Sequence, residues 1–257
     1  MREQGLSEAI RTVGGVSELA RRIGIAQPSV SNWQRVPAER VLAVEAATGI
    51  TRDVLRPDLY AGAAHESVDE CDAARAQEYA LLSVLLVRAP DARLLERLTS
   101  LRGDPSPLGV AHVALAEAAG QTDADRVSRE YFDLFIGLGR GELLPYGSYY
   151  LSGFLHERPL ARLRDDLAEL GIVRAESNVE PEDHAAILCE VMAGIVGGTL
   201  VTPAGTDRRL FERHVASWVG RFFSDLEQAN AADFYRAVGA LGRTFMDIEA
   251  QAFALPS

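Results

Sequence analysis

The sequence predicts an all-α protein of two domains, and three features of its pattern lead to this prediction. From residue 74 onward, apolar residues recur almost throughout at the spacing of amphipathic helices. No window bounded by turn residues shows the period-two alternation of a strand. The helical pattern fails once, at residues 57–70 (PDLYAGAAHESVDE), whose Gly, Ala, Ser and acidic residues are typical of a linker. We therefore expect a small domain at 1–58, a linker at 59–72 and a larger domain at 73–257.

The predicted helices of the larger domain are defined by four apolar stripes with a period close to 3.6 residues. Their members are Leu160, Leu163, Leu167 and Leu170; Ile187, Leu188, Val191, Met192, Ile195 and Val196; Leu210, Phe211, Val215, Trp218 and Phe222; and Phe234, Val238, Leu241, Phe245 and Ile248. We expect these residues to form the core.

The composition is that of a protein with a proper core, since 47% of the 257 residues are hydrophobic. No apolar run is long enough to span a membrane, and the first residues lack the apolar region of a secretory signal. Cys71 and Cys189 are far apart and form no CxxC motif, so a disulfide framework is not predicted. We expect a cytoplasmic protein without membrane insertion.

The charge is divided unevenly along the chain. Residues 1–60 hold 8 Arg and 7 acidic residues, a net charge of +1, which leaves −12 for the rest of a chain whose total is −11. An acidic surface repels nucleic acid, so the larger domain is not expected to be a general nucleic-acid binder. Only the first 60 residues are candidates for contact with DNA, through weak nonspecific electrostatics.

Residues 16–35, VSELARRIGIAQPSVSNWQR, fit a helix-turn-helix. Gly24 suits a turn that requires a positive φ, Ala20 is small where two helices cross, and Pro28 suits the first turn of the second helix. The expected buried positions are Leu19, Ile23, Ile25, Val30 and Trp33. Residues 37–49 predict a supporting helix that ends at Gly49.

On these residues, the segment from about 5 to 60 resembles the Cro-type family that includes the YdaS antitoxin-like repressors. The resemblance implies that Gln27, Pro28, Ser31 and Asn32 face the major groove of an operator DNA. It implies that Arg21, Arg22 and Arg35 face its phosphates. Asn, Gln and Arg side chains suit these roles because they pair bidentately with adenine or guanine. The near-neutral charge leaves a second interpretation open, in which this small helical domain pairs with another protein.

Two further segments attract attention, 127–150 (VSREYFDLFIGLGRGELLPYGSYY) and 180–184 (EPEDH). Taken singly, each has an ordinary explanation. Gly137 or Gly139 would end a helix, because GLGRGE follows a helical pattern and not the strand that a phosphate loop requires. Pro181 suits the first position of a helix, and Glu182 and Asp183 in a first turn complement its dipole.

In combination, the two segments resemble the TorD/DmsD family of cytoplasmic molybdoenzyme chaperones, over about residues 70–250. The resemblance implies that the protein binds a molybdoenzyme catalytic subunit or its twin-arginine signal peptide. Such a peptide carries two guanidiniums, which need carboxylates, and an apolar stretch, which needs aromatic or aliphatic walls. The candidate residues for this site are Leu134, Phe135, Glu142, Pro145, Tyr146, Ser148, Tyr150, Pro181, Glu182, Asp183 and His184.

No enzyme is predicted. The five His residues show no metal-ligand spacing, and no G-x-S-x-G motif is present. We expect no catalytic residue, metal or cofactor.

The first hypothesis is therefore a maturation chaperone for a molybdoenzyme such as formate dehydrogenase, whose DNA-binding domain couples client status to transcription. DNA binding of useful affinity would call for a homodimer. The alternative is a one-component transcriptional regulator whose helical domain senses a small molecule or a protein and no longer acts as a chaperone.

Overall fold

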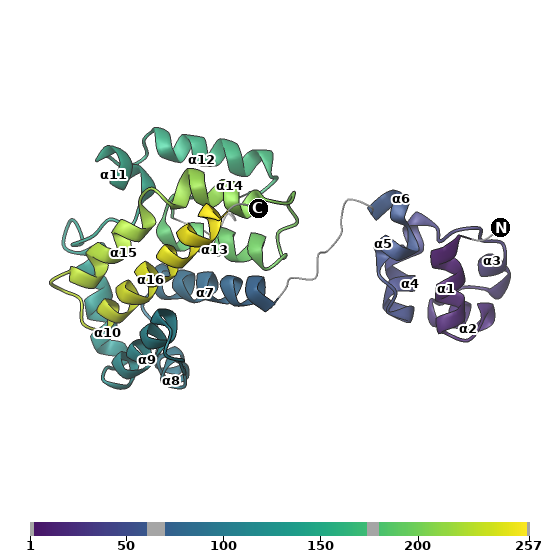
Figure 1. Cartoon of the computed structure of the whole chain (residues 1–257), viewed down its shortest axis with the longest axis horizontal. Helices are drawn as coiled ribbons and strands as arrows, with labels where there is room; N and C mark the ends of the chain where they lie inside the picture. Colours follow the sequence, from purple (N-terminus) through teal and green to yellow (C-terminus); the bar gives the residue numbers. More distant parts are fainter. Residues whose placement is uncertain (1–2, 61–69, 174–179, 256–257) are drawn as a thin grey trace. The chain divides into compact units, whose positions relative to one another are not determined.

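The computed structural model describes residues 3–60, 70–173 and 180–255, and the prediction of an all-α fold is confirmed over them. Within these ranges there are helices and no strand, apart from an isolated antiparallel bridge between Tyr146 and His184. The chain divides into two compact units, Met1–Ser67 and Val68–Ser257 (Figure 1). In the described part of the chain, no helix has the length and apolar character needed to cross a membrane.

The predicted linker, 59–72, overlaps helices at both of its ends. Helix α6 (Pro57–Tyr60) continues to residue 60, and α7 (Glu70–Val87) starts at residue 70. The acids Glu70 and Asp72, read as part of the linker, lie in the first turn of α7, where they complement the helix dipole. The rest of the predicted linker, 61–69, lies outside the described residues.

The first unit is a bundle of short helices around a small apolar core. Its elements are α1 (Gln4–Thr12), α2 (Val16–Arg22), α3 (Gln27–Ser31), η1 (Ala38–Arg40), α4 (Val41–Thr48), α5 (Arg52–Leu55) and α6. Leu19 and Val30 are fully buried, as predicted, whereas Ile23, Ile25 and Trp33 pack half-buried against the same core.

The predicted helix-turn-helix is present in this unit. Gly24 adopts a left-handed φ of +70° between α2 and α3, and Pro28 lies in the first turn of α3. The predicted supporting helix consists of η1 followed by α4, and it ends at Gly49 with a φ of 74°.

The second unit is a larger helical bundle that begins with α7. Its further elements are α8 (Ala92–Leu98), α9 (Pro107–Gly120), α10 (Ala124–Tyr131), η2 (Phe132–Ile136), α11 (Gly147–Ser152), α12 (Arg158–Glu169), α13 (Ala185–Val196), α14 (Thr206–Leu210), η3 (Phe211–Val215), α15 (Val219–Gln228) and α16 (Phe234–Ala254). The segments η2 and η3 are single π-helical turns that continue α10 and α14. Such turns are often found at functional sites.

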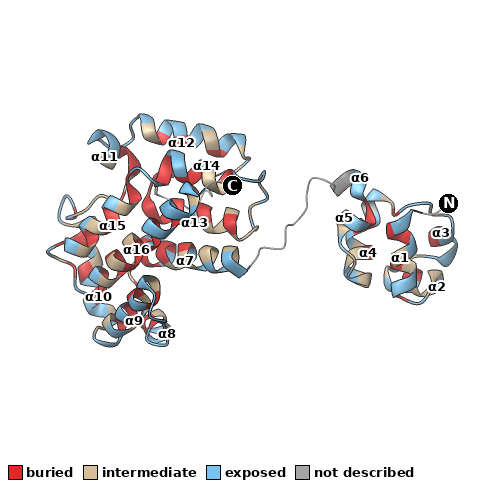
Figure 2. Cartoon of the chain, viewed as in Figure 1, coloured by how far each residue is buried: buried red, intermediate tan, exposed pale blue. Residues whose placement is uncertain are grey.

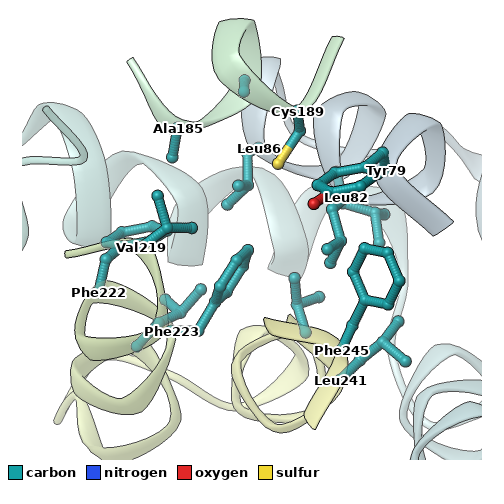
Figure 3. Packing of buried hydrophobic residues seen from close by; sticks show 14 of the residues in the cluster. Tyr79, Leu82, Leu86, Ala185, Cys189, Val219, Phe222, Phe223, Leu241 and Phe245 are labelled. Carbon is teal, nitrogen blue, oxygen red and sulfur yellow. The ribbon is translucent and has the colours of Figure 1, made fainter. Parts of the chain in front are cut away.

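Helix α13 lies in the middle of this unit and packs along α7, while α15 packs along α16. The residues Ala185–Cys189 are all buried, as expected of a helix that is apolar on every side. Figure 3 shows Cys189 of α13 beside Tyr79 of α7, with Phe223 of α15 and Phe245 of α16 pointing into the same interior. Buried residues gather in this way inside each unit (Figure 2).

The predicted apolar stripes are confirmed with few exceptions. Their members are buried except for Leu170 and Ile195, which are half-buried, and Ile248, which is exposed. The close packing of α15 and α16 depends on glycines. A Cβ on Gly239 would meet the backbone nitrogen of Glu227 at 2.4 Å, and one on Gly242 would overlap the ring of Phe223.

A buried ionic cluster, absent from the sequence-based expectations, connects three helices of this unit. The guanidinium of Arg75 donates to both carboxylate oxygens of Glu249, at 2.7 and 2.9 Å, and it also contacts Asp72 and Asp207. The hydroxyl of Tyr79 donates to Glu249 at 2.9 Å. Glu249 is almost wholly buried, so these donors satisfy a charge that would otherwise be costly to desolvate.

Candidate functional site

The segment before α11 and the segment before α13 lie side by side and are joined by backbone hydrogen bonds. The amide of Ala185 donates to the carbonyl of Pro145 at 2.8 Å, and the amide of Gly147 donates to the carbonyl of Asp183 at 2.9 Å. The structure therefore brings together the two segments, 127–150 and 180–184, that the sequence singled out. We call residues 145–148 and 180–185 the junction.

Asp183 has a different place from the one predicted. The sequence suggested the first turn of a helix, but α13 starts at Ala185 and Asp183 precedes its N-cap. The side chain is 3% exposed, and its Oδ2 accepts a hydrogen bond of 2.7 Å from the amide of Ser148. The carboxylate therefore fastens α11 to the start of α13. Its Oδ1 is buried without a hydrogen-bond partner.

His184 is the N-cap of α13. Its Nδ1 accepts a hydrogen bond of 3.0 Å from the amide of Ala186, which requires a ring without a proton on that nitrogen. Burial lowers the pKa of His184 to about 4, although the nearby Glu180 and Asp183 act in the opposite direction. The histidine is thus a neutral structural cap at neutral pH.

Tyr146 covers the junction from its outer side. Its hydroxyl donates to Glu180 at 2.7 Å, and its ring meets that of His184 edge-on, with 5.1 Å between the ring centroids. Burial, and then the bond to Glu180, raises the pKa of Tyr146 well above its usual value. Tyr146 is half-buried, so one side of it remains accessible.

Tyr150 connects α11 to α15. Its hydroxyl donates to Asp225 at 2.9 Å, its ring packs on Trp218, and Arg221 lies over the same ring at 4.9 Å from its centroid. The ring is therefore held between an aromatic and a cationic neighbour. It is half-buried and does not line the junction itself.

Several predicted site residues are not available at the surface. Leu134 is fully buried in the core, and Pro145 and Ser148 are buried in the junction, as are Asp183 and His184. Leu134 lies on the apolar face of its helix, and the other four residues lie where the segments 145–148 and 180–185 pair. The half-buried residues of the junction are Tyr146, Glu180, Pro181 and Glu182.

Phe135 and Glu142 also have structural partners. Phe135 is half-buried and packs edge-on against Tyr131 and Tyr235. The carboxylate of Glu142 accepts hydrogen bonds from the amides of Asn230 and Ala231, at 2.7 and 2.9 Å, and the first of these bonds lowers its pKa. Glu142 therefore braces the loop after α15. It is also exposed, and its contact with a client guanidinium stays a prediction.

A largely apolar groove runs beside the junction, between α12 and α13. Its volume is about 520 Å³. It is lined by Leu167, Ala168, Ile172, Val173, Ile187, Val191, Gly194, Thr199 and Leu200, with Arg164, Glu182 and Glu190 as its charged residues. The Nε of Arg164 donates to the Oε2 of Glu182 at 2.8 Å, and its Nη2 lies 2.8 Å from the same oxygen, so a partly exposed ion pair lies at the edge of this groove. We call it the α12–α13 groove.

A second cavity, of about 570 Å³, lies on another side of Asp183. Its polar lining includes Arg162, Arg213 and His214, and the last two are bonded to Asp166. Asp166 already partners Arg213 and His214, and the unpaired oxygen of Asp183 is shielded from solvent.

The first unit exposes all seven residues predicted to face DNA. These are Arg21, Arg22, Gln27, Pro28, Ser31, Asn32 and Arg35. The three arginines among them have ion-pair partners that a phosphate contact would displace. Both Arg21 and Arg22 bond to Glu18, whose pKa is lowered to about 2 by these hydrogen bonds, and Arg35 contacts Asp58 at 3.3 Å.

No pattern in the sequence singles out Arg164, Glu190 or the apolar lining of the groove. Leu167 and Val191 belong to predicted core stripes, and the ion pair of Arg164 with Glu182 joins residues that no local pattern connects. Among the described residues, no cluster of His, Cys, Asp or Glu is arranged to hold a metal ion.

Comparison with known proteins shows what the two units are similar to. Residues 102–224 match the family described as nitrate reductase delta subunit, and residues 6–64 match the family described as bacterial toxin YdaS. The chain therefore combines one stretch that is similar to the nitrate reductase delta subunit family with another that is similar to the YdaS family.

Individual relatives agree with this division. The chaperone protein TorD of Aliivibrio fischeri is 28% identical over 149 residues, which are 52% of this chain and 68% of the relative, and TorD of Vibrio cholerae is also 28% identical, over 52% and 65%. The putative transcriptional regulator YdaS of Escherichia coli is 41% identical over 58 residues, 20% of this chain and 59% of the regulator.

Among solved structures, a putative redox enzyme maturation protein from Archaeoglobus fulgidus matches with a TM-score of 0.47 and 20% identity. The match covers 67% of this chain and 93% of that one.

Proposed function

We propose that this protein is a cytoplasmic maturation chaperone that binds a molybdoenzyme catalytic subunit or its twin-arginine signal peptide, and that its first unit binds operator DNA. The TorD relatives, which are named as chaperone proteins, support the first part, and the YdaS relative, named as a putative transcriptional regulator, supports the second. Formate dehydrogenase stays the expected client.

The observation that carries the client proposal is the α12–α13 groove. Its apolar wall, including Leu167, Val191 and Leu200, suits an apolar peptide stretch, and the groove continues to Glu182 of the junction. Grooves of this kind bind segments whose apolar side chains they bury while polar groups at the edge fix the register.

The charges of the groove suit the other half of such a peptide. Glu182 is held by Arg164, and a client guanidinium of the same geometry can replace that arginine without leaving the carboxylate unpaired. Glu190 lies in the same lining, and no ion pair joins it to another residue in the described ranges. Two carboxylates for two arginines is the complementarity that the proposal requires.

The test is a binding isotherm of the full chain with a peptide that carries two adjacent arginines and an apolar stretch. Glu182→Gln together with Glu190→Gln should weaken binding at least tenfold, because each lost charge-assisted bond contributes about 1.5–3 kcal/mol. The matched control is Glu169→Gln, an exposed position of α12 outside the groove lining. A peptide with two lysines should bind less tightly, since lysine cannot form the bidentate pair.

The apolar half of the site is tested by Leu200→Ser, with Val110→Ser as the control at an exposed position of α9. Equal affinity of the wild type and of both groove variants would reject the groove. No peptide binding by the wild type, with DNA binding intact, would favour the alternative of a one-component regulator that senses a small molecule or a protein.

The proposal of DNA binding rests on three exposed side chains. Gln27 and Ser31 belong to α3, and Asn32 is its C-cap. Gln27 donates to Ser31 at 2.8 Å, so these two side chains are already ordered next to each other on one face. Side chains of this kind read base edges in the major groove.

A further inference from the structure

A small cleft lined by arginines lies where α7 gives way to α8. Its volume is about 310 Å³, and its charged residues are Arg88, Arg93, Arg97 and Asp91. Val84, Ala89, Pro90 and Leu94 complete the lining. The cleft belongs neither to the junction nor to the α12–α13 groove, and none of its residues was singled out by the sequence.

Within the described residues, the three arginines have no acidic partner. Other arginines of this unit, such as Arg75, Arg164, Arg213 and Arg243, are paired with nearby carboxylates. In contrast, no side-chain hydrogen bond or ion pair joins Arg88, Arg93 or Arg97 to another residue of the described ranges. The carboxylate of Asp91 is used as the N-cap of α8, where it accepts from the amide of Leu94 at 2.8 Å.

The local structure does not account for this arrangement. Arg93 lies in the first turn of α8, next to the positive end of the helix dipole, where an acidic residue is favoured and a cation is not. Arg97 lies one turn later on the same face, and Arg88 follows the end of α7. Three like charges therefore converge on one concavity of a unit whose sequence is otherwise strongly acidic.

We propose that this cleft binds a phosphoryl group carried by a small molecule or a lipid headgroup. A phosphoryl group brings a charge of about −1.5 to −2 near neutral pH and three acceptor oxygens. Guanidiniums are the side chains that match such oxygens bidentately, and three of them neutralise more charge than a single carboxylate brings. The volume suits a small anionic group and not a folded partner.

The experiment titrates the full chain with inorganic pyrophosphate by calorimetry at constant ionic strength. Saturable binding at one site is expected, and Arg93→Gln combined with Arg97→Gln should weaken it at least tenfold. The control removes the same charge elsewhere, with Arg129→Gln and Arg158→Gln, two exposed arginines outside the cleft. Because all four positions are exposed, thermal unfolding should be the same in both variants.

Citrate at the same ionic strength tests the chemical class. Vesicles with and without phosphatidic acid test whether the phosphoryl group is carried by a lipid. Binding to pyrophosphate alone assigns a free molecule, and binding to the phosphatidic acid vesicles alone assigns a headgroup. The proposal is overturned if neither probe binds, if the control variant weakens binding as much as the cleft variant, or if citrate binds as tightly as pyrophosphate.

Discussion

At the scale of single residues, three acidic side chains of the second unit stabilise the fold by holding backbone amides. Asp183 binds the amide of Ser148, and Glu142 binds those of Asn230 and Ala231. Glu130 accepts from the amides of Asp233, Phe234 and Tyr235, at the start of α16. Composition marks such residues as charged and surface-seeking, so their structural roles could not be read from the sequence.

Asp183→Ala is therefore expected to destabilise the second unit. It leaves the buried amide of Ser148 without an acceptor, which costs about 1–3 kcal/mol of unfolding free energy. A carboxylate that only complemented the helix dipole from the first turn would contribute less, about 0.3–1 kcal/mol. Asp183→Asn keeps an oxygen that can accept the bond and should lose less. Denaturant unfolding of the two variants measures the difference, and equal losses would contradict the role of the hydrogen bond.

The buried cap His184 should make stability depend on pH. Its pKa is about 4 in the folded protein, against 6.5 for an unperturbed histidine. Between these values the unfolded chain binds a proton and the folded one does not, so stability falls as the pH decreases from about 6.5 towards 4. A pKa shift of this size corresponds to a loss of about 3 kcal/mol of unfolding free energy over the whole pH interval.

The matched variant is His184→Asn, because asparagine is also a good N-cap but does not titrate. The difference in unfolding free energy between wild type and variant should shrink or reverse as the pH is lowered from 7 to 4.5. A difference that stays constant over this range would show that His184 does not contribute the dependence.

At the scale of secondary structure elements, the apolar period predicted which segments are helical but not where they end. The stripe from Leu210 to Phe222 is continuous in the sequence, yet the structure divides it into α14, η3 and α15. Similarly, the start of α13 is set by His184 and by the pairing of residues 183–185 with 145–148, contacts between segments far apart in the chain. Local propensity cannot report such contacts.

The close approach of α15 and α16 leads to a prediction for this pair of helices. Gly239→Ala should destabilise the second unit by about 1–3 kcal/mol, because the added Cβ would meet the backbone of Glu227 and Phe223, which cannot move aside as a side chain can. Gly220→Ala is the control, since its Cβ meets only the Cβ of Met246 at 3.8 Å. Thermal unfolding of both variants is the measurement, and similar midpoints would count against the packing argument.

At the scale of the whole molecule, the candidate site was predicted only in part. The two segments named from the sequence do meet, but five of the eleven residues assigned to the site are buried, namely Leu134, Pro145, Ser148, Asp183 and His184. A motif in the sequence marks residues whose surroundings restrict the choice of side chain. A buried junction restricts that choice as strongly as a binding surface does. The α12–α13 groove beside the junction depends on how α12 packs near α13, and no local sequence pattern predicts this packing.

The final prediction concerns the first unit acting within the full chain. One short helix, α3, reads only a few base pairs, and residues 1–60 carry a net charge of +1, so useful affinity is expected to require two copies on DNA. A systematic selection for bound DNA should therefore enrich an inverted repeat whose half-sites lie about 34 Å, one helical turn, apart. Asn32→Ala should relax the preference at one base pair of each half-site, at a cost of about 1–3 kcal/mol if its contact is bidentate.

Arg22→Ala should weaken binding to all sequences alike, because a phosphate contact carries no base preference. Its effect should also be smaller than that of a free arginine, since Glu18 competes with the DNA for its guanidinium. Repeating the selection with the client peptide present tests whether client binding changes DNA recognition. If no motif is enriched under either condition, the helix-turn-helix serves contacts with protein, and the coupling of client status to transcription must be abandoned.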